Sequence, residues 1–284
     1  MDKKERADIY QETVHIVKNG EYASPNGTRV TVNDLNDVMI SKTKFYSKKL
    51  NINYNSLPKY NTEVKVVNND CLYEAKKLID DGFSPAVLNM ASFSTPGGGV
   101  INGASAQEEN IFRRTNLFLS LYQFSSIGLN YGVKQKEERY PLHFRYGGIY
   151  TPKVAVFRGG EDVNYELLDD LFYVDIITLS ALKNPTTENG KIIPSAESII
   201  KCKIRQILDI AIENGNDSLV LSAFGCGAYK TPPEQMAMFF ADVLASEDYQ
   251  GVFKVIHFAI IDDPSKNREH NPNGNLKPFQ EIFS

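Results

Sequence analysis

The stretch Ala86–Asn110 reads AVLNMASFSTPGGGVINGASAQEEN, and the architecture of the chain can be worked out from it. An apolar run, Ala86–Met90, has the length of a buried strand, and a polar segment opening at Gln107 follows it across a loop. This pattern predicts a strand, a loop and then a helix from about Gln107 to Tyr122. Three consecutive glycines are costly in backbone entropy, and taken alone they favour a tight structural turn. Their place on one loop with two acids, at the end of a buried strand, favours the close approach of a ligand.

The same layout occurs again nearer the C-terminus. Ser218–Leu221 is a short apolar run, and it leads into AFGCGAYKTPP and a helix that starts near Pro233. In open α/β sheets, ligands bind beyond the carboxyl ends of strands, where loops and helix N-termini present N–H groups. Two glycine loops in this position suit a ligand that carries a diphosphate.

Strands and helices alternate along much of the chain. The expected strands are Thr28–Val32, Glu63–Val67, Ala86–Met90, Lys153–Phe157, Phe172–Leu179, Ser218–Leu221 and Val252–Ile261. The expected helices are 3–18, Cys71–Ile79, Gln107–Tyr122, Ser195–Asn214, Pro233–Ala245 and a short one after Pro278, with a long loop within 123–152. The alternation predicts a three-layer α/β/α fold with a mixed, mostly parallel sheet. Residues 1–60 are predicted to form an N-terminal extension, with its helix, packed on a core of residues 61–284.

Composition narrows the function classes. The net charge of −4 argues against bulk affinity for nucleic acid or membranes. The three cysteines lack CxxC spacing, which fits a reducing compartment. No secretory h-region and no apolar run of membrane-spanning length occur, so the cytoplasm is the expected location. The four histidines show no ligand spacing, and neither a metal nor a cofactor is expected.

Other phosphate-binding and hydrolase patterns are missing from the sequence. It contains no GxxxxGK[ST], which leaves a P-loop ATPase unsupported, and no GxGxxG after the first strand, which disfavours a nicotinamide-dependent dehydrogenase. It contains neither GxSxG nor HExxH.

Three glycines, the seven-residue spacer VINGASA and then Gln-Glu-Glu resemble the catalytic signature of poly(ADP-ribose) glycohydrolases. The flanking AVLNMASFSTPGGG and AQEENIFRRTNLF, the later LVLSAFGCGAY and the N-terminal helix with NGEY are similar to the microbial type of that family. The resemblance implies a macrodomain that hydrolyses ribose–ribose bonds of poly(ADP-ribose) and releases ADP-ribose. It also implies attack at chain ends (exo). The protein is expected to be a monomer.

The resemblance implies roles for individual residues. Glu109 would be the catalytic acid/base, and Glu108, also placed in the catalytic pair, would hold hydroxyls of the distal ribose together with Asn89. The two glycine loops would clasp the diphosphate. The implied substrate-binding residues are Asn89, Gly97, Gly98, Gly99, Gln107, Phe224, Gly225, Cys226, Gly227, Ala228 and Tyr229. Tyr229 departs from the Phe common at its position, and Lys230-Thr231-Pro232 departs from the small residues that often follow.

Cleavage of a ribosyl bond passes through an oxocarbenium-like state, in which the leaving oxygen gains a proton and water is activated. One carboxylate, Glu109, would serve both steps, with a substrate phosphate oxygen as the second helper. Two other functions stay open: hydrolysis of mono-ADP-ribose from protein or nucleic acid, and binding of ADP-ribose without cleavage. The intact Gln-Glu-Glu argues against the latter.

At several positions a structural role is an alternative to contact with a ligand or to catalysis. Asn89 could cap a turn, and Phe224 could be a core ring. Cys226 is expected to be a packing residue and not a nucleophile, because no His lies near it in sequence. Arg113 and Arg114 are expected on a solvated helix surface.

Overall fold

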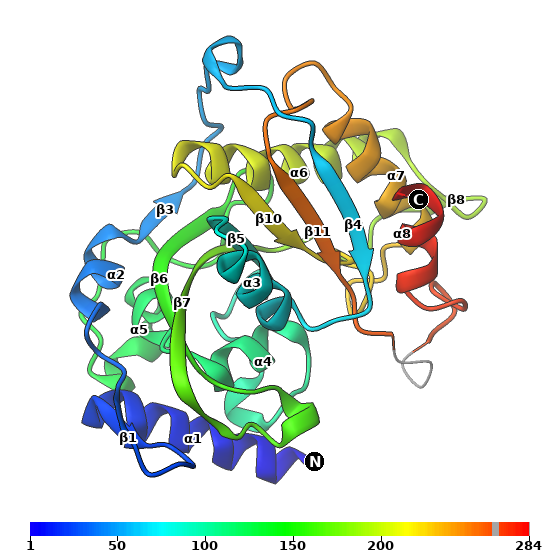
Figure 1. The fold of residues 1–284 in the computed structure, drawn as a ribbon. Helices are drawn as coiled ribbons and strands as arrows, with labels where there is room; N and C mark the ends of the chain where they lie inside the picture. Colours follow the sequence, from blue (N-terminus) through cyan, green and yellow to red (C-terminus); the bar gives the residue numbers. More distant parts are fainter. Residues whose placement is uncertain (263–266, 284) are drawn as a thin grey trace. The chain divides into compact units, whose positions relative to one another are not determined.

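The fold is seen in a computed structural model that describes residues 1–262 and 267–283 (Figure 1). The chain divides into two compact units. One comprises residues 1–45, 89–142 and 149–178, and the other residues 46–88, 143–148 and 179–284. No helix within the described ranges is long and apolar enough to cross a membrane.

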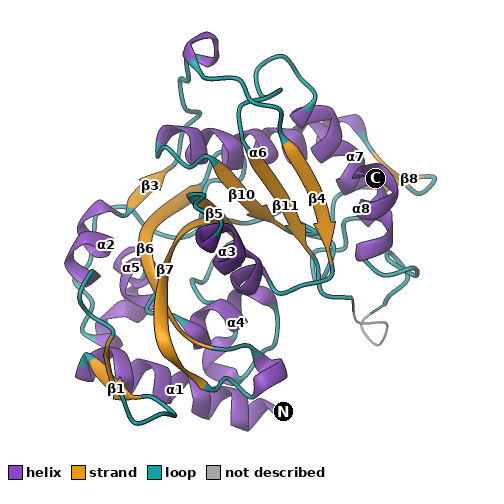
Figure 2. Cartoon of the chain, in the orientation of Figure 1, coloured by secondary structure: helices purple, strands orange, loops and turns teal. Residues whose placement is uncertain are grey.

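Seven strands form one sheet in the order β3-β6-β7-β5-β10-β11-β4. Their bounds are β3 Lys44–Tyr46, β4 Glu63–Val67, β5 Pro85–Met90, β6 Gly148–Arg158, β7 Leu167–Leu179, β10 Ser218–Leu221 and β11 Val255–Ala259. Two antiparallel pairs lie apart from it: β1 (Glu21–Ala23) with β2 (Arg29–Thr31), and β8 (Thr187–Glu188) with β9 (Lys191–Ile192). Figure 2 distinguishes the strands from the helices and loops around them.

The parallel part of the sheet is built from β5, β10, β11 and β4. Ser218 of β10 lies opposite Pro85 of β5 and Val255 of β11, and Glu63 of β4 pairs with Val255 on its other side. Every residue of β10 and β11 is buried. Continuous burial is typical of parallel strands that are covered by helices on both faces.

Helices of the second unit cover these strands. They are α3 (Cys71–Asp80), α6 (Pro194–Glu213), α7 (Pro233–Leu244) and α8 (Leu276–Phe283). The Asp70 side chain caps α3 by accepting the N–H groups of Leu72 and Tyr73, and prolines occupy the first turns of α6 and α7, where their missing N–H has no partner to lose. In Figure 1, α3 lies on the near side of the strands and α6 on the far side.

Helices of the first unit surround an aromatic cluster. They are α1 (Lys3–Asn19), α2 (Asn36–Lys42), α4 (Gln107–Arg114) and α5 (Phe118–Leu121). Tyr10 of α1 lies 6.4 Å from Phe112 and 6.5 Å from Phe118 between ring centroids, and its hydroxyl is 2.8 Å from that of Tyr122. This buried cluster joins α1 to α4 and α5, so α1 is part of the packing of this unit.

The predicted α/β class and parallel strand core are confirmed, with most element ends shifted by a few residues. The prediction of one helix from Gln107 to Tyr122 is wrong. The helix stops at Arg114 because Thr115 is extended (φ −139°, ψ 167°) and bridges to Val156 of β6, and α5 starts only at Phe118. Short 3-10 helices cover 54–56, 100–102, 122–124, 126–131 and 161–163. The predicted boundary between an extension of residues 1–60 and a core stays a prediction.

Candidate active site

The three-glycine loop lies directly against two carboxylates and an aromatic ring. Gly97 (φ +79°) and Gly98 (φ +53°) adopt left-handed backbone conformations that side chains disfavour. A Cβ on Gly97 would lie 2.6 Å from Cε1 of Phe112, and one on Gly98 would lie 2.5 Å from Oε1 of Glu109. The glycines are therefore needed for the contact between this loop and α4, whether or not a ligand is bound.

The Glu108 side chain is buried and holds the loop through both of its oxygens. Oε2 accepts the Ser92 N–H at 2.7 Å, and Oε1 accepts the Gly97 N–H at 2.9 Å. Burial raises the pKa of Glu108 to about 8, the nearby Glu109 carboxylate adds to this, and the two N–H donors act in the opposite direction. Glu108 thus fixes the course of the loop from Ser92 to Gly97.

The Glu109 carboxylate has one tethered and one untethered oxygen. Oε1 accepts the Gly99 N–H at 2.8 Å. Oε2 is buried and has no hydrogen-bond partner among the residues that the structure describes. The loop therefore orients this carboxylate and leaves one oxygen available to a ligand.

Gln107 and Asn89 complete the group of predicted residues in this unit. Gln107 Oε1 accepts the Met90 N–H at 2.8 Å, which ties the start of α4 to the end of β5. Asn89 is fully buried, donates from Nδ2 to Thr178 Oγ1 at 3.2 Å and hydrogen-bonds the Glu108 side chain. Its Oδ1 is a second buried atom without a partner in the described part of the chain.

The spacer between the glycines and Gln107 is supported by α1. A Cβ on Gly103 (φ +72°) would overlap the backbone oxygen of Lys3, at 1.7 Å. Arg113 is fully buried, and its guanidinium donates to the backbone oxygen of Arg6 at 2.9 Å and to that of Ala104. The N-terminal helix therefore fixes the loop that carries the glycines.

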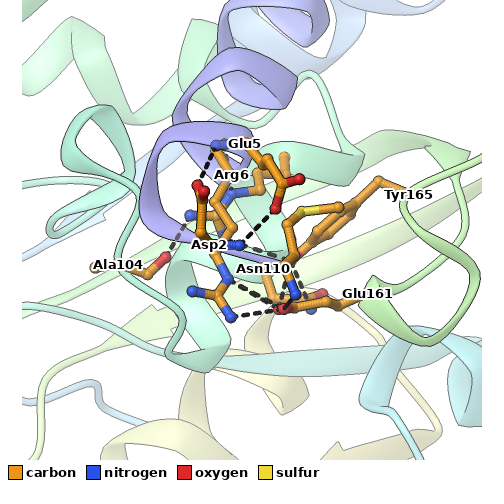
Figure 3. Close-up of polar contacts among 9 residues, drawn as sticks. Asp2, Glu5, Arg6, Ala104, Asn110, Glu161 and Tyr165 are labelled. Atoms are coloured by element: carbon orange, nitrogen blue, oxygen red, sulfur yellow. Dashed lines mark hydrogen bonds and ion pairs between the residues drawn. The ribbon is translucent and has the colours of Figure 1, made fainter.

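An ion pair extends this support to the start of α1. Arg6 and Glu161 face one another in Figure 3, with Arg6 Nη2 2.6 Å from Glu161 Oε1 and Arg6 Nε 3.1 Å from both carboxylate oxygens. Tyr165 lies beside the pair and accepts a hydrogen bond from Asn110 Nδ2 at 3.3 Å. At the helix start, Asp2 and Glu5 form a reciprocal capping box.

The prediction that Arg113 and Arg114 face solvent is wrong, because both side chains are fully buried. Arg114 donates from Nη1 to Asn110 Oδ1 at 3.0 Å and from Nε to the backbone oxygen of Arg158 at 3.2 Å. Helix α1 packs on α4 and covers the face that a solvated helix would expose.

The second glycine loop belongs to the other compact unit. Phe224 and Cys226 are fully buried, whereas Gly227 and Ala228 are exposed. The backbone at Gly225 (φ +78°) passes close to Ala181, because a Cβ on Gly225 would lie 2.8 Å from the Cβ of Ala181. Ligand contacts at 224 and 226 would therefore have to come from their backbones.

Cys226 and Tyr229 are held by contacts with more distant parts of the sequence. Burial raises the pKa of the Cys226 thiol well above its usual value, which agrees with a packing role and not a nucleophilic one. The Cys226 backbone oxygen lies 2.8 Å from His270 Nε2, and the Tyr229 backbone oxygen accepts the Asn184 N–H at 2.9 Å. The ring of Tyr229 is partly exposed.

Sequence reasoning did not find Ser92, Tyr140 or His270. Ser92 contributes its N–H to Glu108, and no residue type marks such a backbone contact. Tyr140 lies in the stretch that had no periodic pattern, yet its hydroxyl is buried and the Glu108 charge acts on it. His270 lies far along the chain from Cys226.

Within the described ranges, no group of three or more His, Cys, Asp or Glu side chains is arranged to hold a metal ion.

A known protein family matches the part of the chain that contains these residues of the first unit. The family model described as microbial-type PARG, catalytic domain, matches residues 10–159, which include the glycine loop and all of α4. The chain belongs to this family. A search of curated proteins gave no match.

Solved structures of poly(ADP-ribose) glycohydrolases (PARG) are similar over nearly the whole chain. The enzyme from Thermomonospora curvata is 28% identical with a TM-score of 0.81, and its complex with the inhibitor ADP-HPD has a TM-score of 0.80; each comparison covers 98% of this chain and 99% of that one. The enzyme from Deinococcus radiodurans in complex with ADP-ribose is 26% identical with a TM-score of 0.70, covering 90% and 99%. The chain thus has the fold of bacterial PARG, as the predicted macrodomain implied.

Proposed function

We propose that this protein hydrolyses the ribose–ribose bonds of poly(ADP-ribose) and releases ADP-ribose, with Glu109 as the acid/base. Membership of the PARG family supports the reaction class. The observation that carries the residue assignment is the difference between two neighbouring carboxylates. Glu108 uses both oxygens to bind loop N–H groups, whereas Glu109 keeps Oε2 buried and without a partner among the described residues.

The proposed mechanism uses Glu109 twice. Its carboxyl first protonates the ribose oxygen that leaves, which stabilises an oxocarbenium-like transition state at the anomeric carbon. The resulting carboxylate then accepts a proton from the attacking water. The Gly99 N–H holds Oε1 throughout, so Oε2 is the atom that gives and takes the proton.

The remaining predicted residues are proposed to bind the substrate. Asn89 and Glu108 would hold hydroxyls of the distal ribose, with the free Asn89 Oδ1 as one acceptor. Gly97–Gly99 and Gly225–Tyr229 would contribute backbone N–H groups to the diphosphate, as glycine loops do elsewhere. Gln107 is also proposed to bind the substrate, and its bond to the Met90 N–H holds it at the start of α4.

The test is digestion of purified poly(ADP-ribose) by the wild type and by Glu109→Gln, with released ADP-ribose quantified. We expect release by the wild type and a loss of roughly 10²-fold or more in the variant, the range of general acid–base catalysis. Binding of ADP-ribose and the thermal midpoint, measured on both proteins, show whether the variant is still folded. Binding by both proteins with cleavage of the polymer by neither would overturn the proposal and leave either a mono-ADP-ribosyl hydrolase or an ADP-ribose-binding macrodomain.

The same digestion addresses two finer parts of the proposal. Exo attack gives ADP-ribose from the earliest time points, whereas endo attack gives oligomers first. Mono-ADP-ribosylated protein and nucleic acid, offered in parallel, separate a polymer hydrolase from a mono-ADP-ribosyl hydrolase. A monomeric, cytoplasmic enzyme also belongs to this proposal, and light scattering and cell fractionation are its tests.

A further inference from the structure

The compact unit that holds Glu108 contains buried polar atoms that have no hydrogen-bond partner in residues 1–262 and 267–283. Three of them are Asn89 Oδ1, Glu109 Oε2 and the hydroxyl oxygen of Tyr140. Buried polar groups in folded proteins are nearly always paired, so an unpaired group calls for an explanation. The proposed function uses the first two atoms and leaves the Tyr140 hydroxyl without a role.

Backbone hydrogen bonds fix the chain at Tyr140 and just after it. The Tyr140 N–H donates to the Phe124 backbone oxygen at 2.9 Å, and the Leu142 N–H donates to the Phe93 backbone oxygen at 3.1 Å. Phe93 directly follows Ser92, whose N–H binds Glu108. The hydroxyl is therefore held at this position by two backbone anchors and not by any bond of its own.

The Tyr140 hydroxyl keeps its proton at neutral pH. Burial, together with the Glu108 charge, raises the pKa of Tyr140 well above its ordinary value. At neutral pH the group can donate one hydrogen bond and accept another.

The other polar groups of the proposed site determine which ligand group suits this hydroxyl. Asn89 Oδ1 is an acceptor, and Glu108 and Glu109 carry the carboxylates of the site. A phosphate oxygen is an acceptor with no proton to donate, so it cannot bond to Asn89 Oδ1. A ribose hydroxyl can donate to Asn89 Oδ1 or to a carboxylate and can also accept from tyrosine.

We propose that Tyr140 is a substrate-binding residue whose hydroxyl donates a hydrogen bond to a ribose hydroxyl of the bound ADP-ribose unit. This inference rests on the proposed function, because it takes ADP-ribose as the ligand. Tyr140 would add a hydrogen-bond donor beside Asn89 Oδ1, an acceptor that has no partner among the described residues.

The experiment compares Tyr140→Phe with a matched control, Tyr22→Phe. Tyr22 is also a buried tyrosine of the same unit, but its hydroxyl donates to the Leu168 backbone oxygen at 2.7 Å. ADP-ribose affinity is measured by calorimetry on the wild type and both variants, and stability is measured by thermal unfolding without ligand. We expect Tyr140→Phe to weaken ADP-ribose binding roughly three- to tenfold, the span of one hydrogen bond, with the thermal midpoint unchanged or raised. Tyr22→Phe should show the reverse, a lower midpoint and unchanged affinity.

Two results would overturn the inference while leaving the proposed function intact. One is equal ADP-ribose affinity in Tyr140→Phe and the wild type. The other is a fall in the thermal midpoint as large as that of Tyr22→Phe, because the hydroxyl would then have a structural partner. Absence of ADP-ribose binding by the wild type itself would overturn both.

Discussion

Gly98 and Glu109 are packed so closely that position 98 has no room for a side chain. A Cβ there would lie 2.5 Å from Glu109 Oε1 and 3.1 Å from Glu108 Oε2, and the backbone at Gly98 has φ +53°. The glycine loop and the two carboxylates therefore form one interlocked structure, in which the loop N–H groups orient the acids and the acids fix the loop.

Substitution of Gly98 by Ala should remove activity and also destabilise the fold. The control is Gly132→Ala, because Gly132 has a similar left-handed backbone (φ +74°) but nothing within 4 Å of its Cβ position. In both variants the free energy of unfolding should fall by about 1 kcal/mol, because alanine disfavours the left-handed backbone conformation. Only Gly98→Ala should also displace the Glu109 carboxylate, so its ADP-ribose release should fall at least roughly tenfold below that of Gly132→Ala, since small displacements of catalytic groups are costly. Equal activity in the two variants would contradict the close packing seen here.

The same substitution at adjacent positions should have opposite effects on stability. Glu109→Gln keeps one oxygen for the Gly99 N–H, and its amide nitrogen replaces an atom without a partner among the described residues. Its unfolding free energy should equal or exceed that of the wild type. Glu108→Gln turns an amide nitrogen toward the N–H of Ser92 or Gly97, so it should lose about 1–3 kcal/mol. Urea denaturation of both variants provides the measurement, and an equal loss in the two would argue against the distinct roles assigned here.

Stability should decrease as the pH rises from about 5 to 8, through Glu108. Its pKa is about 8 in the folded protein against an ordinary value of 4.5, so the folded state holds a proton that the unfolded state releases across this range. The stabilisation from this proton is fully present below the pKa of Glu108 in the unfolded state. It is lost as the pH approaches the pKa in the folded state, and the free energy of unfolding falls by up to about 1.4 kcal/mol per pH unit. Glu108→Gln lacks this titration, so its stability deficit relative to the wild type should shrink with rising pH. A deficit that stays constant from pH 5 to 8 would show that Glu108 titrates normally.

Local sequence patterns were sufficient to predict the strands and loops that hold the candidate site. The apolar run before Asn89 and the run Ser218–Leu221 are short, continuous and followed by glycines, and such signals do not depend on the rest of the chain. The paired loops and the Gln-Glu-Glu segment could therefore be located, together with the helix that starts at Gln107.

Features set by distant residues could not be predicted in this way. Helix α4 ends early because Thr115 pairs with Val156, and Arg113 is buried because α1 covers it. Tyr140 comes within range of the Glu108 charge through its own backbone bond to Phe124 and that of Leu142 to Phe93, which no pattern around Tyr140 indicates. Contacts between residues far apart in the sequence therefore explain both the wrong predictions and the omission of Tyr140.

Arg113 should be needed for both stability and ADP-ribose release, although it is not proposed to touch the substrate. Its planar guanidinium reaches two backbone oxygens at once, that of Arg6 in α1 and that of Ala104 in the spacer. A lysine ammonium is a single point charge on a flexible stem and cannot reproduce this forked geometry. Arg113→Lys should therefore lose about 2–4 kcal/mol of stability, as expected when a buried, hydrogen-bonded charge loses part of its partners.

The control for this prediction is Arg29→Lys, which changes an exposed arginine paired with Glu21 at 2.9 Å. Surface ion pairs of this kind contribute about 0–1 kcal/mol, so this variant should resemble the wild type. Arg113→Lys should in addition lower the rate of ADP-ribose release at saturating polymer, because the spacer that connects the glycine loop to Glu109 is no longer fixed to α1. If Arg113→Lys matched Arg29→Lys in both urea denaturation and turnover, α1 would have no part in holding the site.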